Sequence, residues 1–324
     1  MISSADLIRA GAAVLRGRKP ALSIEITKEC PLRCPGCYAF SEGHVGAGVD
    51  LRQLSDRRGE ALITGVLELV ERQRPLHVSL VGGDPMVRYR ELEVLVPRLL
   101  AMGVYLQVVT SAFRPLPAAW SGLPRFELVV SVDGLAPEHD RRRAPATYAR
   151  ILKHIEGQHV TIHCTITAPM VRQAGYLETF VRQWSENPNV RKIWMSVFTP
   201  QRGQELEEIP SAAERAAIIT ELLRLRLVYP RLEMPAAMVH ELEHPPASPA
   251  ECVFARMTEV VSADLESRVA PCQFGGDPDC SRCGCIASMG LAAVAHYRVL
   301  GGLEAGHILR GAESLGHFLG AATH

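Results

Sequence analysis

Three cysteines lie close together near the start of the chain, in the segment IEITKECPLRCPGCYAF. Cys30, Cys34 and Cys37 have the spacing C-x3-C-x2-C. Thiolates are soft ligands that suit iron–sulfur clusters, and a compact loop of this kind can hold three irons of a cubane while the fourth iron stays open. An open iron is a place where a cofactor or substrate can bind. The spacing therefore predicts a [4Fe-4S] cluster with one free coordination site.

Two other interpretations use the same cysteines. Cys34-Pro-Gly-Cys37 could be a redox dithiol of the thioredoxin type, but such a dithiol does not need Cys30. A structural zinc site would need a fourth ligand at the spacing of a zinc finger, and the sequence has none there. The cluster remains the preferred hypothesis.

A second group of cysteines lies toward the C-terminal end of the chain. Four thiolates would complete a second cubane or a tetrahedral zinc site. Cys164 stands alone between the groups, and we expect it to be a small buried apolar residue without a role. Because the chain has no export signal, grouped cysteines favour metal ligation over disulfides. The five members of the group are Cys252, Cys272, Cys280, Cys283 and Cys285.

Alternating strand and helix patterns must position these cysteines. Strands are predicted at 21–27, 77–81, 105–110, 127–132, 160–166 and 191–198, and helices near 51–72, 88–102, 146–157, 174–186 and 211–227, with a weaker one at 114–121. This alternation implies parallel pairing with right-handed crossovers, in an incomplete barrel or a doubly wound sheet. In both architectures ligands gather at the carboxyl ends of the strands. The first cysteine group follows the first of these strands.

Small and polar residues follow the later strands. Glycines allow close approach of a backbone to a ligand, and exposed carbonyls accept hydrogen bonds from an ammonium group. Hydroxyls and carboxylates can bind ribose hydroxyls, and an arginine can pair with a carboxylate through two hydrogen bonds. The basic run 141–143 could equally be a solvated turn. His163 and Ser196 are weaker candidates that could face the lumen. The main candidates are Gly82, Gly83, Asp84, Pro85, Thr110, Ser111, Ser131, Asp133 and Arg143.

The cysteine segment after the first strand resembles the signature of the radical S-adenosylmethionine (SAM) superfamily, and the likeness extends through most of residues 21–200. The resemblance implies a partial (β/α)6 barrel and a cluster whose open iron chelates the amino and carboxylate groups of SAM. One electron then cleaves SAM to methionine and a 5′-deoxyadenosyl radical, which abstracts hydrogen from the substrate.

Two further motifs look like elements of the same family. Residues 82–85 are similar to its G-G-E-P element, with Asp for Glu, and residues 131–143 resemble its S-x-D-G…H-D-x-x-R pattern. The resemblance implies that these strand ends bind SAM. One departure is Gly36, which stands where the family often has an aromatic residue before the last cysteine. The contact with adenine must then come from elsewhere, and Tyr38 is a candidate.

The C-terminal cysteines resemble the auxiliary-cluster domains called SPASM and twitch. Ser267 stands where their pattern has Gly before Cys272, and Cys280 and Cys283 provide the later C-x2-C. The longer cysteine-rich tail of SPASM domains is absent, so the resemblance implies one auxiliary [4Fe-4S] cluster, with Cys285 as a spare or a replacement. A cluster with four cysteine ligands suits electron transfer, and one with a missing ligand suits substrate binding.

The predicted fold class is therefore α/β. We expect an amphipathic helix in residues 1–20, the barrel in 21–231 and the auxiliary-cluster domain in 232–324. The helix at 5–16 could cap a barrel mouth or lie on a lipid surface. Apolar residues make up 47% of the chain and its formal net charge is zero, so nothing indicates disorder or a global electrostatic attraction to nucleic acid or an anionic membrane. With no spanning stretch or targeting segment, a cytoplasmic location is expected.

The resemblance implies a SAM-cleaving oxidoreductase or maturase that oxidises or cross-links a peptide or natural-product substrate. A flavodoxin-type or ferredoxin-type carrier would supply its electrons. The stretch before the first strand is too short for a leader-binding domain, which weakens the peptide hypothesis. A lipid or polyprenoid substrate of the hopanoid type stays open. So does a non-catalytic iron–sulfur electron carrier, although such a carrier has no need of the nucleotide-sized site at 82–85 and 131–133.

Overall fold

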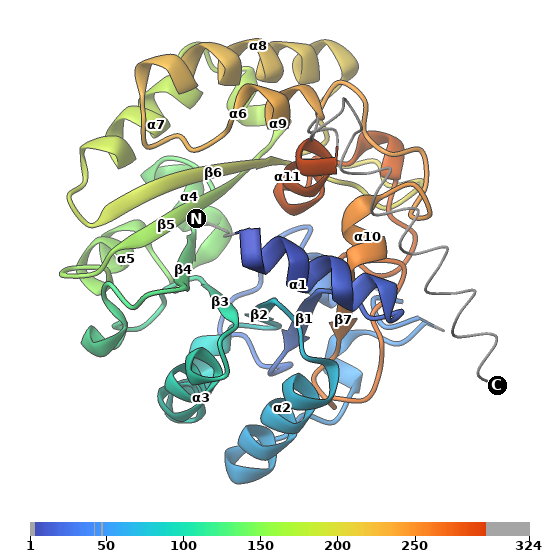
Figure 1. Ribbon diagram of the computed structural model, residues 1–324. Coiled ribbons are helices and arrows are strands. Elements are labelled where there is room, and N and C mark those ends of the chain that lie inside the picture. Colours follow the sequence, from blue (N-terminus) through green and yellow to red (C-terminus); the bar gives the residue numbers. More distant parts are fainter. Residues whose placement is uncertain (1–3, 42, 47, 296–324) are drawn as a thin grey trace.

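A parallel sheet of seven strands forms the framework of the protein, as seen in a computed structural model that describes residues 4–41, 43–46 and 48–295. The strand order is β6-β5-β4-β3-β2-β1-β7, and the sheet curves into a partial barrel that is open between β6 and β7 (Figure 1). The strands are β1 (Ala21–Glu25), β2 (His77–Val81), β3 (Tyr105–Thr110), β4 (Phe126–Ser131), β5 (Val160–Ile166), β6 (Val190–Val197) and β7 (Thr258–Val261).

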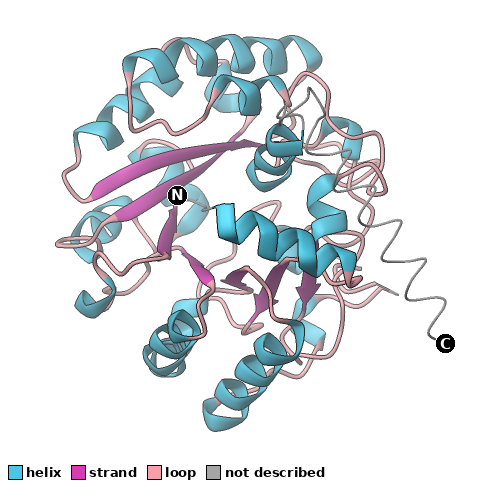
Figure 2. Ribbon diagram, viewed as in Figure 1, coloured by secondary structure: helices cyan, strands magenta, loops and turns pink. Residues whose placement is uncertain are grey.

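Helices follow the strands and cover the outer face of the sheet (Figure 2). The α-helices are α1 (Ser4–Leu15), α2 (Gly59–Gln73), α3 (Tyr89–Ala101), α4 (Ala136–Arg143), α5 (Tyr148–His154), α6 (Ala168–Val171), α7 (Tyr176–Glu186), α8 (Ala212–Val228), α9 (Ala236–His240), α10 (Val253–Met257) and α11 (Ile286–Ala295). Short 3-10 helices occupy Tyr38–Phe40, Leu51–Gln53, Pro85–Arg88, Ala118–Trp120 and Cys280–Arg282.

The alternation of side chains along the strands separates a packed outer face from a polar inner face. On β3, Leu106 and Val108 are buried, whereas Gln107 between them is half-buried. Ser79 on β2 donates to Gln107 at 3.3 Å, so the inner face carries hydrogen bonds between neighbouring strands. A helix such as α2 presents apolar residues at helical spacing to the outer face. Those of α2 that are buried are Leu62, Ile63, Val66, Leu69 and Val70.

All six predicted strands are present, but the sheet has a seventh. β7 lies in the region assigned to the auxiliary domain and pairs in parallel with β1, so the sheet continues past residue 231. β7 has only four residues, between α10 and a turn, and so short a segment gives no recognisable strand pattern in the sequence. The cysteine-rich stretch is therefore more regular than expected. The part of it at 296–324 lies outside the described residues.

Two helix predictions need correction. The helix predicted near 51–72 begins only at Gly59, after a separate 3-10 turn at Leu51–Gln53, and Asp56 between them lies 2.7 Å from the guanidinium of Arg88. The basic run 141–143 is not a turn but the last part of α4. Its many charges hide the helical pattern. The weak helix at 114–121 is only the 3-10 turn at 118–120.

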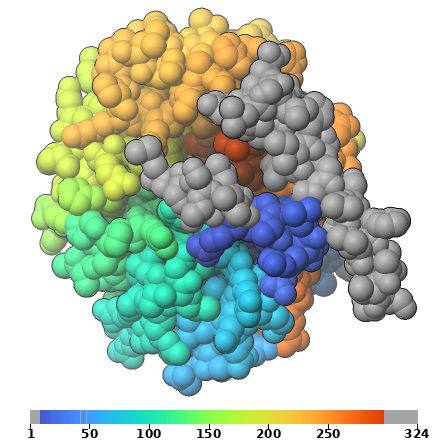
Figure 3. All heavy atoms as spheres, in the orientation of Figure 1, coloured from blue at the N-terminus to red at the C-terminus, as the bar shows by residue number. Residues whose placement is uncertain are grey.

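Elements from both ends of the chain close the partial barrel. Lys19, just after α1, donates to the carbonyls of Ala255 and Thr258 at 2.8 and 3.2 Å, beside the starts of β1 and β7. Helix α11 contacts β6 and α9, and Figure 3 shows its red atoms recessed between the orange upper layer and blue α1. No helix within the described residues is long and apolar enough to span a membrane.

Candidate metal and cofactor site

The first cysteine group lies on the loop that leaves the carboxyl end of β1. All three thiols are free and half-buried. Burial raises the pKa of Cys30 to about 12, and the nearby Asp84 and the thiols of Cys37 and Cys34 add to the effect. Three neighbouring thiols that resist ionisation together become good thiolate ligands only when a cation compensates their charge. The donor set therefore fits an iron centre.

The turn after β2 fixes the backbone that leads into Cys30. The amide of Gly83 donates to the Thr27 carbonyl at 2.8 Å, and the amide of Asp84 donates to the Glu29 carbonyl at 2.9 Å. A Cβ at Gly82 would lie 2.5 Å from the Thr27 oxygen, and one at Gly83 would lie 2.1 Å from the Glu29 oxygen. The close approach that requires glycine is thus to the cysteine loop, and not only to a ligand.

The carboxylate of Asp84 is engaged inside the protein. It accepts from the hydroxyl of Thr110 at 2.7 Å, from the amide of Ser111 at 2.9 Å and from the amide of Met86 at 3.0 Å. The Ser111 hydroxyl also contacts it. The structure brings these predicted residues together, with Pro85 buried among them. Their side chains bind one another and join the end of β3 to the turn that holds the cysteine loop.

The end of β4 places a carboxylate beside two arginines. Asp133 is 2.8 Å from Nε of Arg143 and 3.7 Å from Nε of Arg142. Burial alone would raise the pKa of Asp133, but the two guanidiniums outweigh it and hold that pKa below its ordinary value. Arg142 also donates to the Pro35 carbonyl at 3.3 Å, whereas Arg141 is exposed. One oxygen of Asp133, Oδ1, is buried without a hydrogen-bond partner among the described residues.

His139 and Asp140 brace this strand end. Nδ1 of His139 accepts from the amide of Asp133 at 3.1 Å, and its other nitrogen lies 2.8 Å from the Ala146 carbonyl, to which it must donate. Burial lowers the pKa of His139, which keeps the ring neutral in this role. Asp140 accepts from the amide of Tyr148 at 2.6 Å. In the H-D-x-x-R pattern, His139 and Asp140 therefore fix the backbone around the end of β4, and Arg143 pairs with Asp133.

An aromatic ring lies where Gly36 lacks a side chain. Gly36 has φ +66°, and a Cβ there would lie 3.0 Å from Cε2 of Phe198, just after β6. Phe198 is 7% exposed and lines the cavity beside Cys34 and Cys37. Sequence reasoning named Tyr38 as the substitute aromatic and missed Phe198, which is distant in the chain. The only sequence signal for Phe198 was its position at a strand end.

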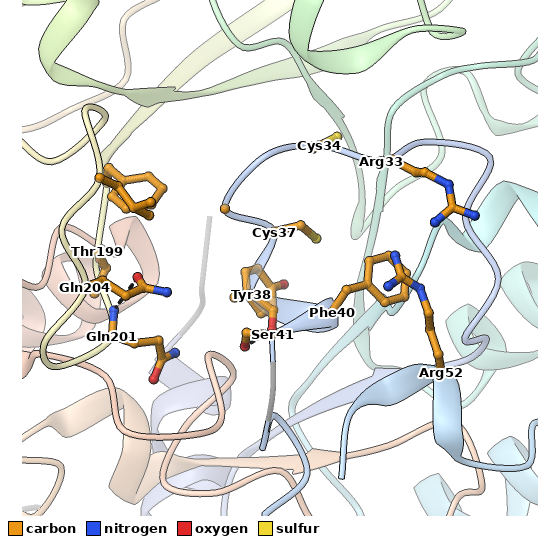
Figure 4. Close-up of a pocket in the computed structure, with 13 residues that line it drawn as sticks. Arg33, Cys34, Cys37, Tyr38, Phe40, Ser41, Arg52, Thr199, Gln201 and Gln204 are labelled. Carbon is orange, nitrogen blue, oxygen red and sulfur yellow. Dashed lines mark hydrogen bonds between the residues drawn. The ribbon is translucent and has the colours of Figure 1, made fainter. Parts of the chain in front are cut away.

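A cavity of about 400 Å³ opens beside the cysteine loop. In Figure 4 the loop runs through the middle, with Arg33, Phe40 and Arg52 on one side and Thr199, Gln201 and Gln204 on the other. Its size falls within the range typical of ligand sites. The cavity therefore gives access from outside to the segment that carries Cys34 and Cys37.

The five C-terminal cysteines line one small hollow between α10, α11 and the loop at 272–285. Burial raises the pKa of Cys272 to about 12, and the thiols of Cys283, Cys252 and Cys280 add to the effect. The sulfur of Cys285 accepts a hydrogen bond of 3.0 Å from the Gln273 amide, and the sulfur of Cys252 lies 3.2 Å from the Ser288 hydroxyl. Among the described residues, no three His, Cys, Asp or Glu side chains are close enough to share one metal ion. A cluster in which each iron takes its own thiolate does not require such a group.

A buried ion pair that sequence reasoning missed joins the two cysteine regions. Glu25 of β1 lies 2.7 Å from Nε2 of His44 and accepts from the Ser262 hydroxyl at 2.6 Å. Nδ1 of His44 lies 3.1 Å from the Phe274 carbonyl, just after Cys272. Burial opposes protonation, but hydrogen bonding to Glu25 outweighs it and raises the pKa of His44. A glutamate inside the apolar strand ALSIE was the signal available in the sequence.

Tyr38 lies between the two cysteine groups. Its ring packs edge-on against Phe274, with 5.2 Å between centroids. Burial raises the pKa of Tyr38, and charges on Cys37, Glu25, Cys285 and Cys272 raise it further, so members of both groups are nearby. Tyr38 also lines the cavity beside Cys37. The ring of Tyr38 therefore lies close to both cysteine groups.

His163 and Ser196, the weaker candidates, contact each other across β5 and β6. Nε2 of His163 is 2.8 Å from the Ser196 hydroxyl, which also accepts from the Ile286 amide at 3.2 Å. Burial lowers the pKa of His163 to about 4. The lone Cys164 is buried. The start of α11 is thereby attached to β6 beside the carboxyl ends of β4 and β5.

Sequence comparison supplies relatives for the first half of the chain. Residues 24–173 match the family model of the Radical SAM superfamily. PqqA peptide cyclase of Rhizobium meliloti is 30% identical over 123 residues, which cover 36% of this chain and 30% of the relative. 7-carboxy-7-deazaguanine synthase of Hyperthermus butylicus is 36% identical over 108 residues, which cover 32% of this chain and 39% of the relative. The match thus spans about a third of each curated relative's length.

Solved structures show the same fold over most of the chain. Streptococcus suis SuiB bound to precursor peptide SuiA has a TM-score of 0.56 and 14% identity, covering 89% of this chain and 64% of SuiB. The protein anSMEcpe with bound AdoMet has a TM-score of 0.55 and 13% identity, covering 84% and 76%. At such identities the likeness concerns the fold alone. Together with the family match, it shows that residues 24–173 of this chain form a radical SAM superfamily domain.

Proposed function

We propose that the chain is a radical SAM enzyme that cleaves SAM reductively and abstracts a hydrogen atom from its substrate. The observation that carries the proposal is the arrangement at the carboxyl ends of β1, β2 and β4. The amides of Gly83 and Asp84 hold the backbone that leads into the three thiols, and Cys34 lies near the buried Asp133 and its arginines. A carrier that only stores electrons has no use for such a polar, nucleotide-sized site.

Each element of this site has a role in the proposal. Cys30, Cys34 and Cys37 hold the cluster, which supplies the one-electron cleavage of SAM when both are bound. Backbone carbonyls of the turn at 82–85 accept from the SAM ammonium group. The unpartnered Oδ1 of Asp133 accepts from a ribose hydroxyl, with Ser131 beside it. Asp84, Thr110 and Ser111 act indirectly, since their side chains hold the turn in place.

Phe198 supplies the aromatic contact that Gly36 lacks. Replacement of Phe198 by alanine is expected to weaken SAM binding about tenfold, because stacking of a base on an aromatic ring contributes about 1–3 kcal/mol. Phe198→Tyr keeps the ring and should bind SAM nearly as well as the wild type. Equilibrium dialysis of SAM against the anaerobic holoenzyme measures the effect. Unchanged affinity in Phe198→Ala would remove Phe198 from the adenine site.

The second cysteine group holds one auxiliary [4Fe-4S] cluster in this proposal. We assign Cys252, Cys272, Cys280 and Cys283 as its ligands, since the other three thiols raise the pKa of Cys272. Cys285, which also lies near Cys283 and Cys272, is the fifth thiol and accepts a hydrogen bond from Gln273. With four protein ligands the cluster is suited to accept the electron that remains after hydrogen abstraction and loss of a proton. The net result would be oxidation or cross-linking of the substrate.

The ligand assignment predicts different outcomes for neighbouring cysteines. Cys285→Ala should keep the full iron content, because Cys285 is not a ligand in this assignment. Cys280→Ala should lower the iron content by up to half, since one of two cubanes loses a ligand. Iron analysis per chain after anaerobic reconstitution measures both. Equal losses in the two variants would contradict the assignment, and zinc in place of iron would contradict the cluster.

A peptide or a natural-product intermediate is the proposed substrate. PqqA peptide cyclase among the relatives and peptide-bound SuiB among structures of the same fold support a peptide. The match to 7-carboxy-7-deazaguanine synthase supports a small molecule. The polar inner face of the barrel, with neutral His163 at its upper edge, offers hydrogen bonds to either class.

Formation of 5′-deoxyadenosine is the direct test of the function. The reconstituted holoenzyme is incubated anaerobically with dithionite and SAM, and the nucleoside is quantified by chromatography. We expect slow formation without substrate. If reduced clusters are seen by electron paramagnetic resonance and no 5′-deoxyadenosine forms, the protein is an electron carrier and the enzyme proposal fails.

A further inference from the structure

Two arginines on the outer side of the cysteine loop have no ion-pair partner among the described residues. Arg33 and Arg52 are exposed and line the cavity beside Cys34 and Cys37. The guanidinium of Arg52 lies over the ring of Phe40, 4.1 Å from its centroid. Stacking on an aromatic face holds a guanidinium in place while its hydrogen-bond donors stay available. Both guanidiniums lie on the same side of the cavity in Figure 4.

The other arginines around this loop are neutralised. Arg142 and Arg143 pair with Asp133, and Arg88 lies 2.7 Å from a carboxylate oxygen of Asp56. Among the described residues that line the cavity, none is an aspartate or a glutamate. Within the described part of the chain, the cavity therefore carries the charges of Arg33 and Arg52 without an acidic partner, beside Cys34 and Cys37.

The proposed function requires electrons from outside at this place. Each cleavage of SAM consumes one electron, and the rate of electron transfer falls steeply with distance. A donor must therefore dock close to the ligands of the first cluster. The tip of the loop is exposed, and Gly36 has no side chain to cover it. A protein seated over the cavity would be separated from Cys34 and Cys37 by little more than the loop itself.

We propose that Arg33 and Arg52 form the docking surface for an acidic one-electron carrier protein, an inference that rests on the proposed function. The reduced carrier gives one electron and becomes oxidised by one electron, and the cluster gains that electron, with no bond made or broken. Arginine and aromatic residues are enriched in protein interfaces, and complementary charge chiefly raises the rate of association. Gln204 on the opposite wall adds polar contacts at the rim.

The test uses the anaerobic holoenzyme and an acidic flavodoxin as the probe. Stopped-flow absorbance measures the second-order rate at which flavodoxin hydroquinone reduces the clusters, and titration calorimetry measures binding of oxidised flavodoxin. The double variant Arg33→Gln/Arg52→Gln is expected to lower both rate and affinity about tenfold at low ionic strength. The wild-type rate should fall as salt rises, and the two proteins should converge within about twofold at high salt.

Matched variants separate charge from general damage. Arg33→Lys/Arg52→Lys keeps both charges and should retain most of the association rate. Arg98→Gln removes an exposed guanidinium from α3, on the outer face of the sheet, and should have no effect. An equal loss in the lysine variant, or in Arg98→Gln, would overturn the docking surface.

Two further measurements keep this proposal apart from the proposed function. Dithionite is a small reductant that needs no docking surface, so the glutamine variant should form 5′-deoxyadenosine with dithionite as fast as the wild type. Absence of the nucleoside in the wild type sinks the function. If the wild type forms the nucleoside and the glutamine variant shows unchanged flavodoxin kinetics, only the docking-surface proposal is refuted. Weaker SAM binding with unchanged flavodoxin binding would assign the arginines to SAM instead.

Discussion

Simultaneous replacement of Cys30, Cys34 and Cys37 by alanine is expected to abolish formation of 5′-deoxyadenosine and to leave about half of the iron, because one of two cubanes is lost. The free thiols at the end of β1 are the only protein ligands proposed for the first cluster, so no activity should remain without them. Iron per chain and the nucleoside yield are measured after the same anaerobic reconstitution as for the wild type.

Cys164→Ala is the matched control for this experiment. Cys164 is a buried free thiol on β5 that belongs to neither group, so its removal should change neither iron content nor activity. Loss of all iron from the triple variant would show that the second group cannot hold a cluster by itself. Zinc in the remaining site would refute the auxiliary cubane.

Gly83→Ala is expected to displace the first cysteine loop and to remove most SAM cleavage. The new Cβ would lie 2.1 Å from the carbonyl oxygen of Glu29, which is backbone and cannot rotate away. Overpacking of this kind costs about 1–3 kcal/mol, unless the loop moves to relieve it. Because the same loop carries Cys30, movement should lower the iron bound at the first group and leave the second group intact. Iron content, 5′-deoxyadenosine and the melting temperature report the outcome.

Gly11→Ala provides the comparison for this variant. A Cβ at Gly11 would meet no atom within 4 Å, and alanine favours a helix such as α1. Normal iron content in Gly11→Ala together with a loss in Gly83→Ala would support the role of the turn. A Gly83→Ala protein with full iron and full activity would show that the turn does not position the cysteine loop.

Local pattern carried much of the prediction. The six longer strands are recognisable because alternating or continuous apolar runs reflect burial within each run. Helix α8 begins at a capping box of Ser211 and Glu214, which also lies within a few residues of sequence. β7 and α4 were not predicted, because their structure depends on contacts with residues that are distant in the sequence. β7 is a strand chiefly because β1 offers an edge for pairing, and two of the three arginines of α4, Arg142 and Arg143, pair with Asp133.

The sequence by itself determined which residues could do chemistry, because the spacing of Cys30, Cys34 and Cys37 after a strand is a local property of the chain. Only the tertiary structure decided how they are supported. The glycines that follow β2 support the cysteine loop, Phe198 fills the space beside Gly36, and Glu25 joins the two cysteine regions through His44. These contacts join residues far apart in sequence, and their energies depend on distances that exist only after the strands have assembled into a common sheet.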